Sequence, residues 1–436
     1  MNPLAKSLND ALEGTAAGRL LSGLGRELYF PKGIIAQGAQ AKKAASFANG
    51  TIGMAYSGGK PLILSALADC APELSADEIV AYAPTAGTEK AREAWKKALL
   101  KKNPSLETLG FSMPAVTAGL TSGLSCVADL FFGAGDVALA SGPCWDNYDL
   151  IFETRRQARL SRVPFFAPDA GAGSGLDIAG IRAAILESAK SGSARIVFNF
   201  PNNPAGYSPG AREAGELAGI VREAAEGGAD VLVICDDAYF GLFYEADAFR
   251  ESLFSKMAGL HERVLAVKID GPIKEDFAWG LRIGFVTFAS KGLEPARYEA
   301  LVTKLTGALR STVSCASTVG QSMLVRAMED PRTEGEKAAY AEILRRRYRL
   351  VKDYALARRD FPYLRALPFN SGYFMSFASV PDAEDIRLAL LEERGIGLVS
   401  LGPDCLRVAY SGIEEDKIVA ALDAAYETAE RLAKKG

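Results

Sequence analysis

The chain has 436 residues, of which 49% are hydrophobic and 24% are charged, and its formal net charge is −3. This profile is typical of a soluble globular protein, and the length predicts two or three domains, each with its own core. The small negative charge gives no indication of a nucleic-acid partner. No apolar stretch reaches membrane-spanning length and the N-terminus lacks a long apolar core, so we expect a cytoplasmic protein with no membrane partner.

Cysteine and histidine content excludes several kinds of site. The six cysteines are scattered and form no C-x-x-C pair, which favours reduced, mostly buried thiols over a disulfide frame or a zinc site. The single histidine, His261, nearly excludes a Ser-His-Asp triad and a multi-histidine metal site. We therefore expect no metal site, and His261 is typical of a surface residue.

The N-terminal residues 1–60 predict an arm with a helix, which contributes to a smaller domain. Thr88 is placed to cap a helix over residues 89–102, in which glutamates and lysines are spaced for mutual support. From about residue 114, apolar strands alternate with amphipathic helices. The expected strands cover residues 136–141, 158–166, 194–200, 230–236, 264–270 and 284–289.

This alternation predicts an α/β fold, with a mainly parallel sheet and helices on both faces in a large domain over residues 61–325. Beyond Arg310 the texture changes to long helices, followed by short strands over residues 373–379 and 406–411 and a closing helix. Residues 326–436 therefore predict a smaller α+β domain, which the N-terminal residues complete.

Polar residues gather at the carboxyl ends of the expected strands, where ligands bind in doubly wound sheets. One strand ends in Pro201 to Gly206, and the next ends in Asp236 to Tyr239. Gly119 to Thr121 open a helix whose N-terminal amides suit an anion. Each signal alone is typical of a turn or a helix cap, but their order along the chain favours one shared site.

Lys274 lies in a loop just after the strand over residues 264–270, and Arg282 follows in the same loop. A partly desolvated lysine amine can form an imine with an aldehyde, and a guanidinium fork suits a phosphate. Together they match what pyridoxal phosphate requires, namely one covalent attachment and one anionic anchor. Taken alone, Lys274 is more typical of a solvated surface loop, because surface lysines are common.

Across nearly its whole length the chain resembles the fold-type I pyridoxal phosphate enzymes, and among them the class I/II aminotransferases of the aspartate and aromatic branch. The residues that carry the resemblance are Gly119-Leu120-Thr121, Pro143-Cys144-Trp145, Asn203-Pro204-Ala205-Gly206, Asp236-Asp237-Ala238-Tyr239, Lys274, Gly280-Leu281-Arg282 and Leu406-Arg407. The resemblance implies transfer of an amino group from an amino acid to a 2-oxo acid such as 2-oxoglutarate. A C–S lyase or amino-acid decarboxylase on the same fold is the alternative, because those enzymes use the same lysine, aspartate and arginine.

The resemblance implies catalytic and ring-binding roles. Lys274 carries pyridoxal 5'-phosphate and transfers the proton, and Asp236 pairs with the protonated pyridine nitrogen. Asn203 and Tyr239 hydrogen-bond the phenolic oxygen, and Trp145 stacks on the ring.

The phosphate, by the same resemblance, is bound by Leu120 and Thr121, which follow Gly119, and by Arg282. Gly271 stands where the family usually has a phosphate-binding serine, so one hydroxyl is lost and a backbone amide is the substitute. The aspartate branch also places histidines behind the ring, where this chain has Tyr148 and Asn202.

Substrate and partner roles follow from the same resemblance. Arg407 forms a bidentate pair with the substrate α-carboxylate beside Asn203. Gly53 lies in a segment that resembles the branch's substrate loop, and Arg310 matches an arginine that reaches an acidic side chain across a dimer. Tyr82 matches a tyrosine that reaches the phosphate of the neighbouring subunit, which implies a homodimer with shared sites.

Two other classes of protein are disfavoured by what the chain contains or lacks. A regulatory protein with a degenerate site would lack the lysine or the ring aspartate, and Lys274 and Asp236 are both present. A dinucleotide-binding oxidoreductase would carry G-x-G-x-x-G after its first strand, and no such motif occurs there.

Overall fold

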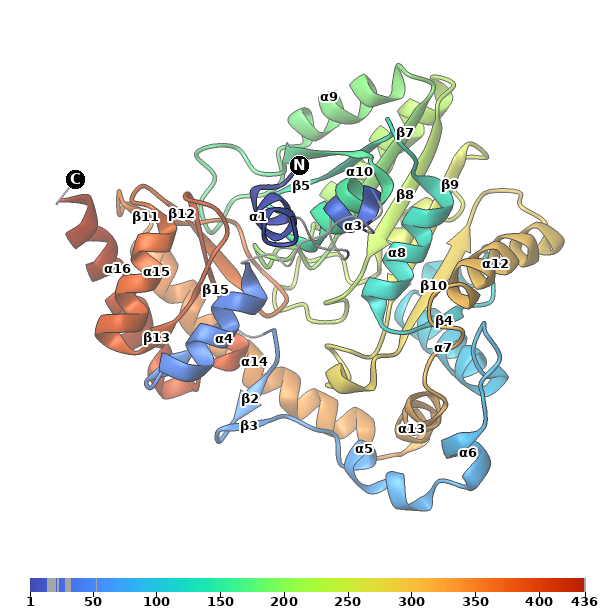
Figure 1. Ribbon diagram of the computed structural model, residues 1–436, viewed down its shortest axis with the longest axis horizontal. Coiled ribbons are helices and arrows are strands. Elements are labelled where there is room, and N and C mark those ends of the chain that lie inside the picture. The colour runs from blue at the N-terminus through green and yellow to red at the C-terminus, as the bar shows by residue number, and fades with distance from the viewer. Residues whose placement is uncertain (14–20, 22, 28–32, 52, 435–436) are drawn as a thin grey trace.

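A seven-stranded sheet forms the centre of the larger lobe in the computed structural model, which describes residues 1–13, 21, 23–27, 33–51 and 53–434 (Figure 1). Among its strands β10 runs antiparallel to both neighbours, and the others run parallel to one another. In sheet order the strands are β4 (Ala115–Thr117), β10 (Gly284–Ala289), β9 (Val264–Asp270), β8 (Asp230–Asp236), β7 (Ser193–Asn199), β5 (Val137–Gly142) and β6 (Arg159–Pro164). The predicted α/β class with a mainly parallel sheet is confirmed.

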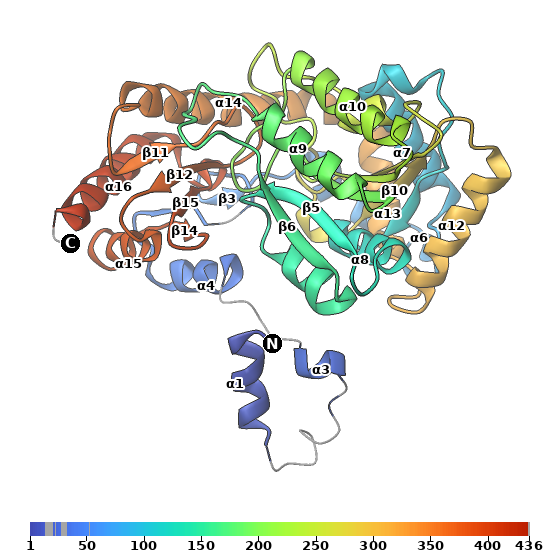
Figure 2. The ribbon, with the colours of Figure 1, turned by 90° about the horizontal axis from the view of Figure 1, so that it is seen from above.

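Both faces of this sheet are covered, which explains why its strands are apolar without alternation. In β8, Val233 packs into the core on one face and Ile234 packs into the core on the other, because successive side chains of a strand point to opposite faces. The helices of the two cores lie on opposite sides of the sheet (Figure 2). They are α9 (Ile178–Ala189), α10 (Ala211–Glu226) and α11 (Leu253–Met257) on the first face, and α8 (Leu120–Phe131) and α12 (Pro295–Arg310) on the second.

The smaller lobe is built from both ends of the described chain (Figure 1). Its four strands pair antiparallel, and β1 (Ala48–Asn49) pairs with β13 (Ile396–Gly397) in a separate two-stranded sheet. The strands, in sheet order, are β11 (Leu364–Ala366), β12 (Met375–Ser379), β15 (Cys405–Val408) and β14 (Val399–Ser400). The helices are α4 (Ile34–Ala44), α15 (Ala383–Arg394), which was not predicted, and α16 (Ile418–Ala433). The domain boundaries predicted near residues 60 and 325 stay predictions.

Several further elements pack around the two lobes. The hydroxyl of Thr88 accepts a hydrogen bond from the Ala91 amide (3.3 Å), so the predicted cap of α7 is confirmed. The long helix α14 has its first turns beside the larger lobe and its later turns in the core of the smaller lobe. The elements are α5 (Ser65–Asp69), α6 (Ala76–Val80), α7 (Glu89–Lys102), α13 (Thr318–Glu329), α14 (Thr333–Ala357), β2 (Tyr56–Ser57) and β3 (Lys60–Pro61).

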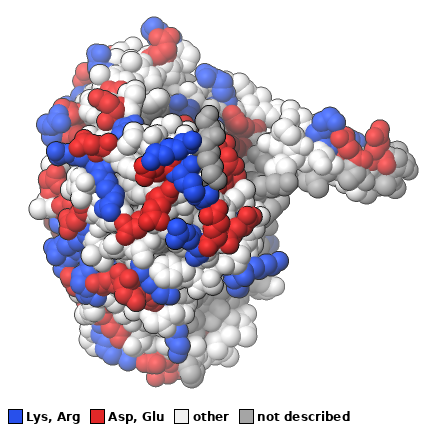
Figure 3. All heavy atoms as spheres, turned by 90° about the vertical axis from the view of Figure 1, so that its left-hand side faces the viewer, with Lys and Arg blue, Asp and Glu red and all other residues white. Residues whose placement is uncertain are grey.

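The first helices of the chain, α1 (Pro3–Ala11) and α3 (Gly23–Glu27), project from the body of the molecule (Figures 2 and 3). On the face drawn in Figure 3, acidic and basic side chains are interspersed, so no patch of one sign dominates it. In the described part of the chain, no helix combines the length and the apolar character needed to cross a bilayer.

A buried ion cluster joins the ends of β8 and β9. The Lys268 side chain is fully buried, and its ammonium contacts the carboxylates of Asp237 and of Asp270 (3.2 Å). Asp237 also accepts a hydrogen bond from the Ser252 hydroxyl (2.5 Å), and Asp270 accepts one from the Trp95 indole (2.9 Å). Because a buried charge is costly without partners, this set of contacts directs the Asp237 carboxylate toward Lys268.

We expect Lys268→Met to lower the free energy of unfolding by about 3–5 kcal/mol, because it leaves two buried carboxylates without a cation. Urea denaturation of the cofactor-free protein measures this. The control is Arg263→Met, whose ion pair with Asp230 is exposed (46% and 74%) and which should cost less than about 1 kcal/mol. If both variants are equally mild, the cluster does not stabilise the fold.

Candidate active site

The carboxyl ends of β7, β8 and β9 border a cavity of about 270 Å³. Parallel strands end at the same edge of a sheet, so residues distant in sequence meet there. Ten of the residues expected from the sequence line this cavity: Gly53, Leu120, Thr121, Trp145, Asn203, Asp236, Tyr239, Lys274, Arg282 and Arg407.

The Lys274 amine is buried in this cavity. Its Nζ donates a hydrogen bond to the carbonyl of Gly53 (2.7 Å) and lies 4.8 Å from the centre of the Tyr239 ring. Burial, together with the positive charges of Arg407 and Arg282, lowers the pKa of Lys274 to about 7. A large fraction of this amine is therefore unprotonated at neutral pH, which is the form that attacks a carbonyl carbon.

Gly53 lies close to the amine. A Cβ added at Gly53 would lie 3.2 Å from both Lys274 Nζ and Tyr239 Oη. A larger residue at this position would therefore require the amine or the phenol to shift.

Asp236 offers a buried carboxylate to the cavity. Tyr148, which is also buried, donates a hydrogen bond from its hydroxyl to Asp236 Oδ2 (2.7 Å). Burial raises the pKa of Asp236 to about 6, and the hydrogen bond from Tyr148 opposes that rise. Asn202 does not contribute, because its amide donates to a serine hydroxyl on β5. Tyr148 alone thus occupies the supporting position where the family usually has histidine, and Asp237 faces Lys268 instead.

One end of the cavity is suited to an anion. Gly119 has a positive φ of 80° and precedes the N-terminus of α8 at Leu120, where the amides of Leu120 and Thr121 begin the helix. A Cβ added at Gly119 would lie 2.5 Å from Arg282 Nη2, so the absent side chain lets the guanidinium approach the helix end.

Gly271 is equally confined, because an added Cβ would lie 2.8 Å from Leu120 Cδ1. The serine usual in the family would not fit there without a shift.

Arg407 is a buried guanidinium with neutral hydrogen-bond partners. Its Nη1 donates to Asn203 Oδ1 (3.0 Å) and its Nη2 donates to the carbonyl of Thr51 (3.0 Å). Its Nε has no hydrogen-bond partner among the described residues, and the group lies 4.3 Å from the centre of the Phe374 ring. A buried cation with unused donor capacity is suited to bind a carboxylate.

Besides Gly119 and Gly271, which border the cavity without lining it, two expected residues lie apart from it in this single subunit. Tyr82 is 94% exposed, and so are large parts of Ile79 and Val80 beside it. Arg310 lies at the end of α12, is exposed, and donates a hydrogen bond to the Ser314 hydroxyl (2.6 Å). Their roles across a dimer stay predictions.

Comparison with known proteins identifies the family. Residues 54–424 match the family described as aminotransferase class I and II. The chain belongs to the class I and II aminotransferases. The predicted family and the predicted transaminase activity on amino acids are thereby confirmed.

The relatives of this aminotransferase agree with that assignment. A probable aspartate/prephenate aminotransferase of Aquifex aeolicus is 24% identical over 353 residues, which cover 78% of this chain and 80% of that protein. The fold is similar to an aminotransferase of Anaerococcus prevotii (TM-score 0.79, 22% identity, 92% and 97% of the two chains). It is also similar to the aspartate aminotransferase of Thermus thermophilus with maleate (TM-score 0.70, 20% identity, 92% and 97%).

Some residues of the cavity were not expected from the sequence. They are Ile34, Leu124, Asn199, Ala238, Ile273 and Phe374. Most are apolar, and an apolar side chain that faces a ligand gives the same sequence signal as one that faces the core. Thr51 was missed for another reason, because it binds Arg407 through its backbone carbonyl.

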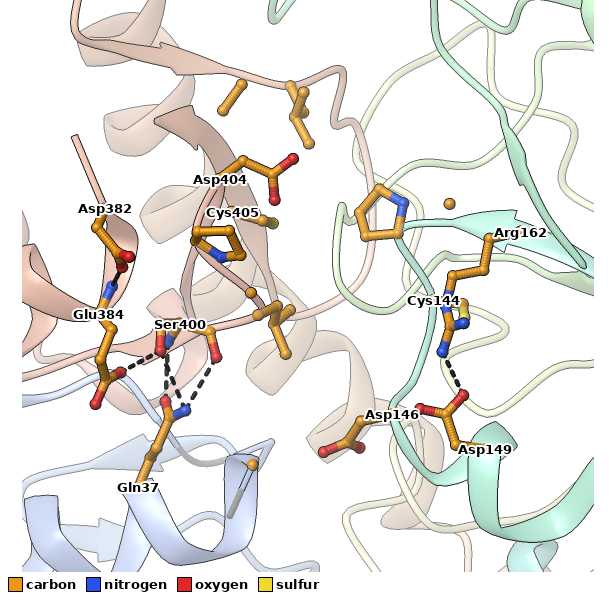
Figure 4. Close-up of a pocket in the computed structure, with 18 residues that line it drawn as sticks. Gln37, Cys144, Asp146, Asp149, Arg162, Asp382, Glu384, Ser400, Asp404 and Cys405 are labelled. Carbon is orange, nitrogen blue, oxygen red and sulfur yellow. Dashed lines mark hydrogen bonds and ion pairs between the residues drawn. The ribbon is translucent and has the colours of Figure 1, made fainter. Parts of the chain in front are cut away.

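A larger cavity of about 800 Å³ lies beside the active site, between the two lobes of this aminotransferase (Figure 4). Arg162 pairs with Asp149 on one side of it, and the Gln37 amide donates to the Ser400 carbonyl on the other (3.0 Å). Asp146, which directly follows Trp145, also lines it. None of its lining residues is a lysine.

The raised pKa of Asp236 predicts a pH-dependent effect of Asp236→Asn in the cofactor-free protein. The aspartate pKa is about 6 in the folded chain and about 4 when unfolded. Folding of the wild type is therefore favoured by proton binding below about pH 4, and this contribution is lost as the pH rises through about 6. Because asparagine does not titrate, Asp236→Asn should gain about 2–3 kcal/mol relative to wild type between pH 4 and pH 8. Chemical denaturation across this range measures the difference, and parallel pH profiles would contradict it.

Proposed function

We propose that this aminotransferase binds pyridoxal 5'-phosphate in the smaller cavity and transfers amino groups from an amino acid to a 2-oxo acid with Lys274, Asp236 and Tyr239 as catalytic residues. The observation that carries the proposal is the desolvated Lys274 amine, with a pKa of about 7, in the same cavity as the buried Asp236 carboxylate. The chemistry of the lining residues fits the cofactor, since an amine, a carboxylate and an anion-binding end occupy separate sides of one cavity.

The ring of the cofactor would be bound by four residues. Asp236 would accept a hydrogen bond from the protonated pyridine nitrogen, and its pKa of about 6 leaves it mostly ionised at neutral pH. Trp145 would stack on one face, while Asn203 and Tyr239 would donate to the phenolic oxygen. When bound, pyridoxal phosphate supplies a conjugated cationic ring that stabilises negative charge at the substrate α-carbon.

The phosphate would lie at the N-terminus of α8. The backbone amides of Leu120 and Thr121 point along the helix axis toward this end, and Arg282 adds a full positive charge beside Gly119. Because Gly271 is too confined for a serine, the guanidinium and the amides would bind the phosphate without that extra hydroxyl.

Proton transfer and substrate orientation depend on groups that are held rigidly. Lys274 Nζ would accept the proton from the substrate α-carbon, and a pKa near 7 suits both uptake and release. Arg407 would hold the α-carboxylate, since its Nε is free of partners among the described residues. Tyr239 is fixed by edge contacts with Tyr373 (5.5 Å) and Phe374 (5.1 Å), which also exclude water from this side.

The attachment site can be tested directly. Borohydride reduction of the protein with bound pyridoxal phosphate should fix the label to Lys274, and peptide mass mapping should find it there. Lys274→Ala should lower kcat by several orders of magnitude, because it removes both the attachment and the proton acceptor. A label on another lysine, such as the fully buried Lys268, would overturn the assignment.

We further propose a homodimer in which each site uses residues of both subunits. Ile79, Val80 and Tyr82 expose 44%, 76% and 94% of their surface, and such a cluster of apolar side chains is typical of a covered surface. Arg310 would then bind the distal carboxylate of an acidic amino donor in the partner's site. The names of two relatives, which mention aspartate, support this substrate class.

The shared site predicts complementation between two chains that are each impaired with acidic donors. Arg310→Ala should lower kcat/KM for aspartate or glutamate by about 30-fold or more and leave other donors far less affected, because a desolvated guanidinium–carboxylate pair is worth roughly 2–5 kcal/mol. Arg407→Ala, the matched control, should impair every amino donor.

In mixed dimers of Arg310→Ala and Lys274→Ala chains, one site has both residues intact and should recover activity with acidic donors. Equal loss for all donors, or no recovery on mixing, would contradict the proposal.

A further inference from the structure

Two carboxylates directly follow Lys274, and neither lines the active-site cavity. The Glu275 side chain is 13% exposed and forms an ion pair with Lys102, which lies in the last turn of α7. The Asp276 side chain is 12% exposed and pairs with Lys337 (2.5 Å), which lies near the start of α14. The end of α7 and the start of α14 therefore each supply one lysine to the loop.

Other contacts with neighbouring elements fix the conformation of this loop. Phe277 has a positive φ of 54°, which is unfavourable for a bulky side chain and persists only where the surroundings fix it. Its ring packs against Tyr340 of α14 at 5.1 Å between centroids. The Tyr373 hydroxyl donates to the carbonyl of Lys274 (2.8 Å). The ion pair of Lys337 thus adds to a set of contacts in which α14 holds the loop.

Glu275 also packs closely against the turn that follows Tyr239. Gly241 has a positive φ of 94°, and a Cβ added there would collide with the Glu275 carboxylate. The Lys274 loop and the Tyr239 turn are therefore in direct contact through Glu275, behind the cavity that their functional side chains line.

The charges around Lys274 explain why these pairs matter for its chemistry. The cations that face its amine are Arg407 and Arg282, and the other titratable groups that line or border the cavity are Tyr239, Tyr373 and Asp236. An unpaired carboxylate in the adjoining loop would favour the ammonium form and oppose the two arginines.

Around Asp276 itself, the facing cations are two lysines of the neighbouring helices, Lys337 and Lys102. Burial would raise the pKa of Asp276, but Lys337 and Lys102 lower it below its ordinary value, so Asp276 is a charged carboxylate. Glu275 and Glu334 both interact electrostatically with Lys337. The effect of the two loop carboxylates on the amine therefore depends on Glu275 keeping its pair with Lys102 and Asp276 keeping its pair with Lys337.

We propose that Glu275 and Asp276 are positioning residues for Lys274, and that their ion pairs with Lys102 and Lys337 orient its loop while neutralising the two carboxylates that directly follow it in the chain. This inference rests on the proposed role of Lys274 in binding the cofactor aldehyde. It assigns to the first turns of α14 a direct part in setting the reactivity of the amine.

The test uses two single variants, whose expected shifts have opposite signs, and the double variant that combines them. Lys337→Met leaves Asp276 as an uncompensated anion and should raise the pH midpoint of Lys274 reactivity by about 0.5–1 unit. Asp276→Asn leaves Lys337 as an uncompensated cation and should lower that midpoint. The double variant removes both charges and should restore the wild-type midpoint. The measurement is the rate at which the cofactor-free protein captures added pyridoxal phosphate, followed by absorbance across pH 5–9.

The matched control is Lys101→Met, next to Lys102 in α7, whose ion pair with Glu334 is 69% and 68% exposed; its midpoint should not move. Thermal unfolding separately reports loss of stability, which shifts no midpoint by itself. Shifts of the same sign in both single variants, or none in either, would overturn the inference. Failure of the wild type to capture the cofactor at Lys274 would instead overturn the proposed function.

Discussion

The buried amine of Lys274 is the feature on which the rest of the active site depends. An ammonium group transferred from water into a protein interior loses its hydration, and without a carboxylate partner it tends to lose its proton instead. In this chain the two nearest cations, Arg407 and Arg282, act in the same direction as burial. The acids of the adjoining loop are kept occupied by Lys102 and Lys337. Removal of water and placement of like charges together produce a reactive amine.

Two adjacent aspartates contribute to different parts of the folded chain, one to the active-site cavity and the other to a buried ion cluster. Asp236 and Asp237 are neighbours at the end of one strand, and both are buried. Burial raises the pKa of both carboxyls, but Asp237 meets the buried lysine of the ion cluster, whereas Asp236 meets a neutral phenol. A carboxylate without a cation is unfavourable in the folded protein alone, but it is available to a positively charged ring. Asp236 therefore keeps a buried negative charge without a cationic partner, at a position where a ligand can neutralise it.

Two departures from the usual family pattern have a structural reason in this chain. Tyr148 takes the supporting position at Asp236 with a single hydrogen bond of 2.7 Å. Burial raises the pKa of the Tyr148 hydroxyl well above its ordinary value, so this donor keeps its proton near neutral pH, where an imidazole would titrate. Gly271 replaces a serine because the Leu120 side chain and the Ile283 carbonyl fill the space where a Cβ would stand.

The sequence by itself determined the fold class, the family and the identity of most of the cavity residues. Strand periodicity and the chemistry of Lys274, Asp236, Arg282 and Arg407 are local properties of the chain, and they are visible without coordinates. Tertiary structure decided what depends on the approach of distant segments. Examples are the Thr51 carbonyl at Arg407, the Tyr148 hydroxyl at Asp236 and the lysines of α7 and α14 at the Lys274 loop. Backbone groups have the same chemistry at every position, and the sequence around a lysine on a helix does not indicate which carboxylate it will contact. Only burial and contacts in the folded chain show which of these groups lie at the active site.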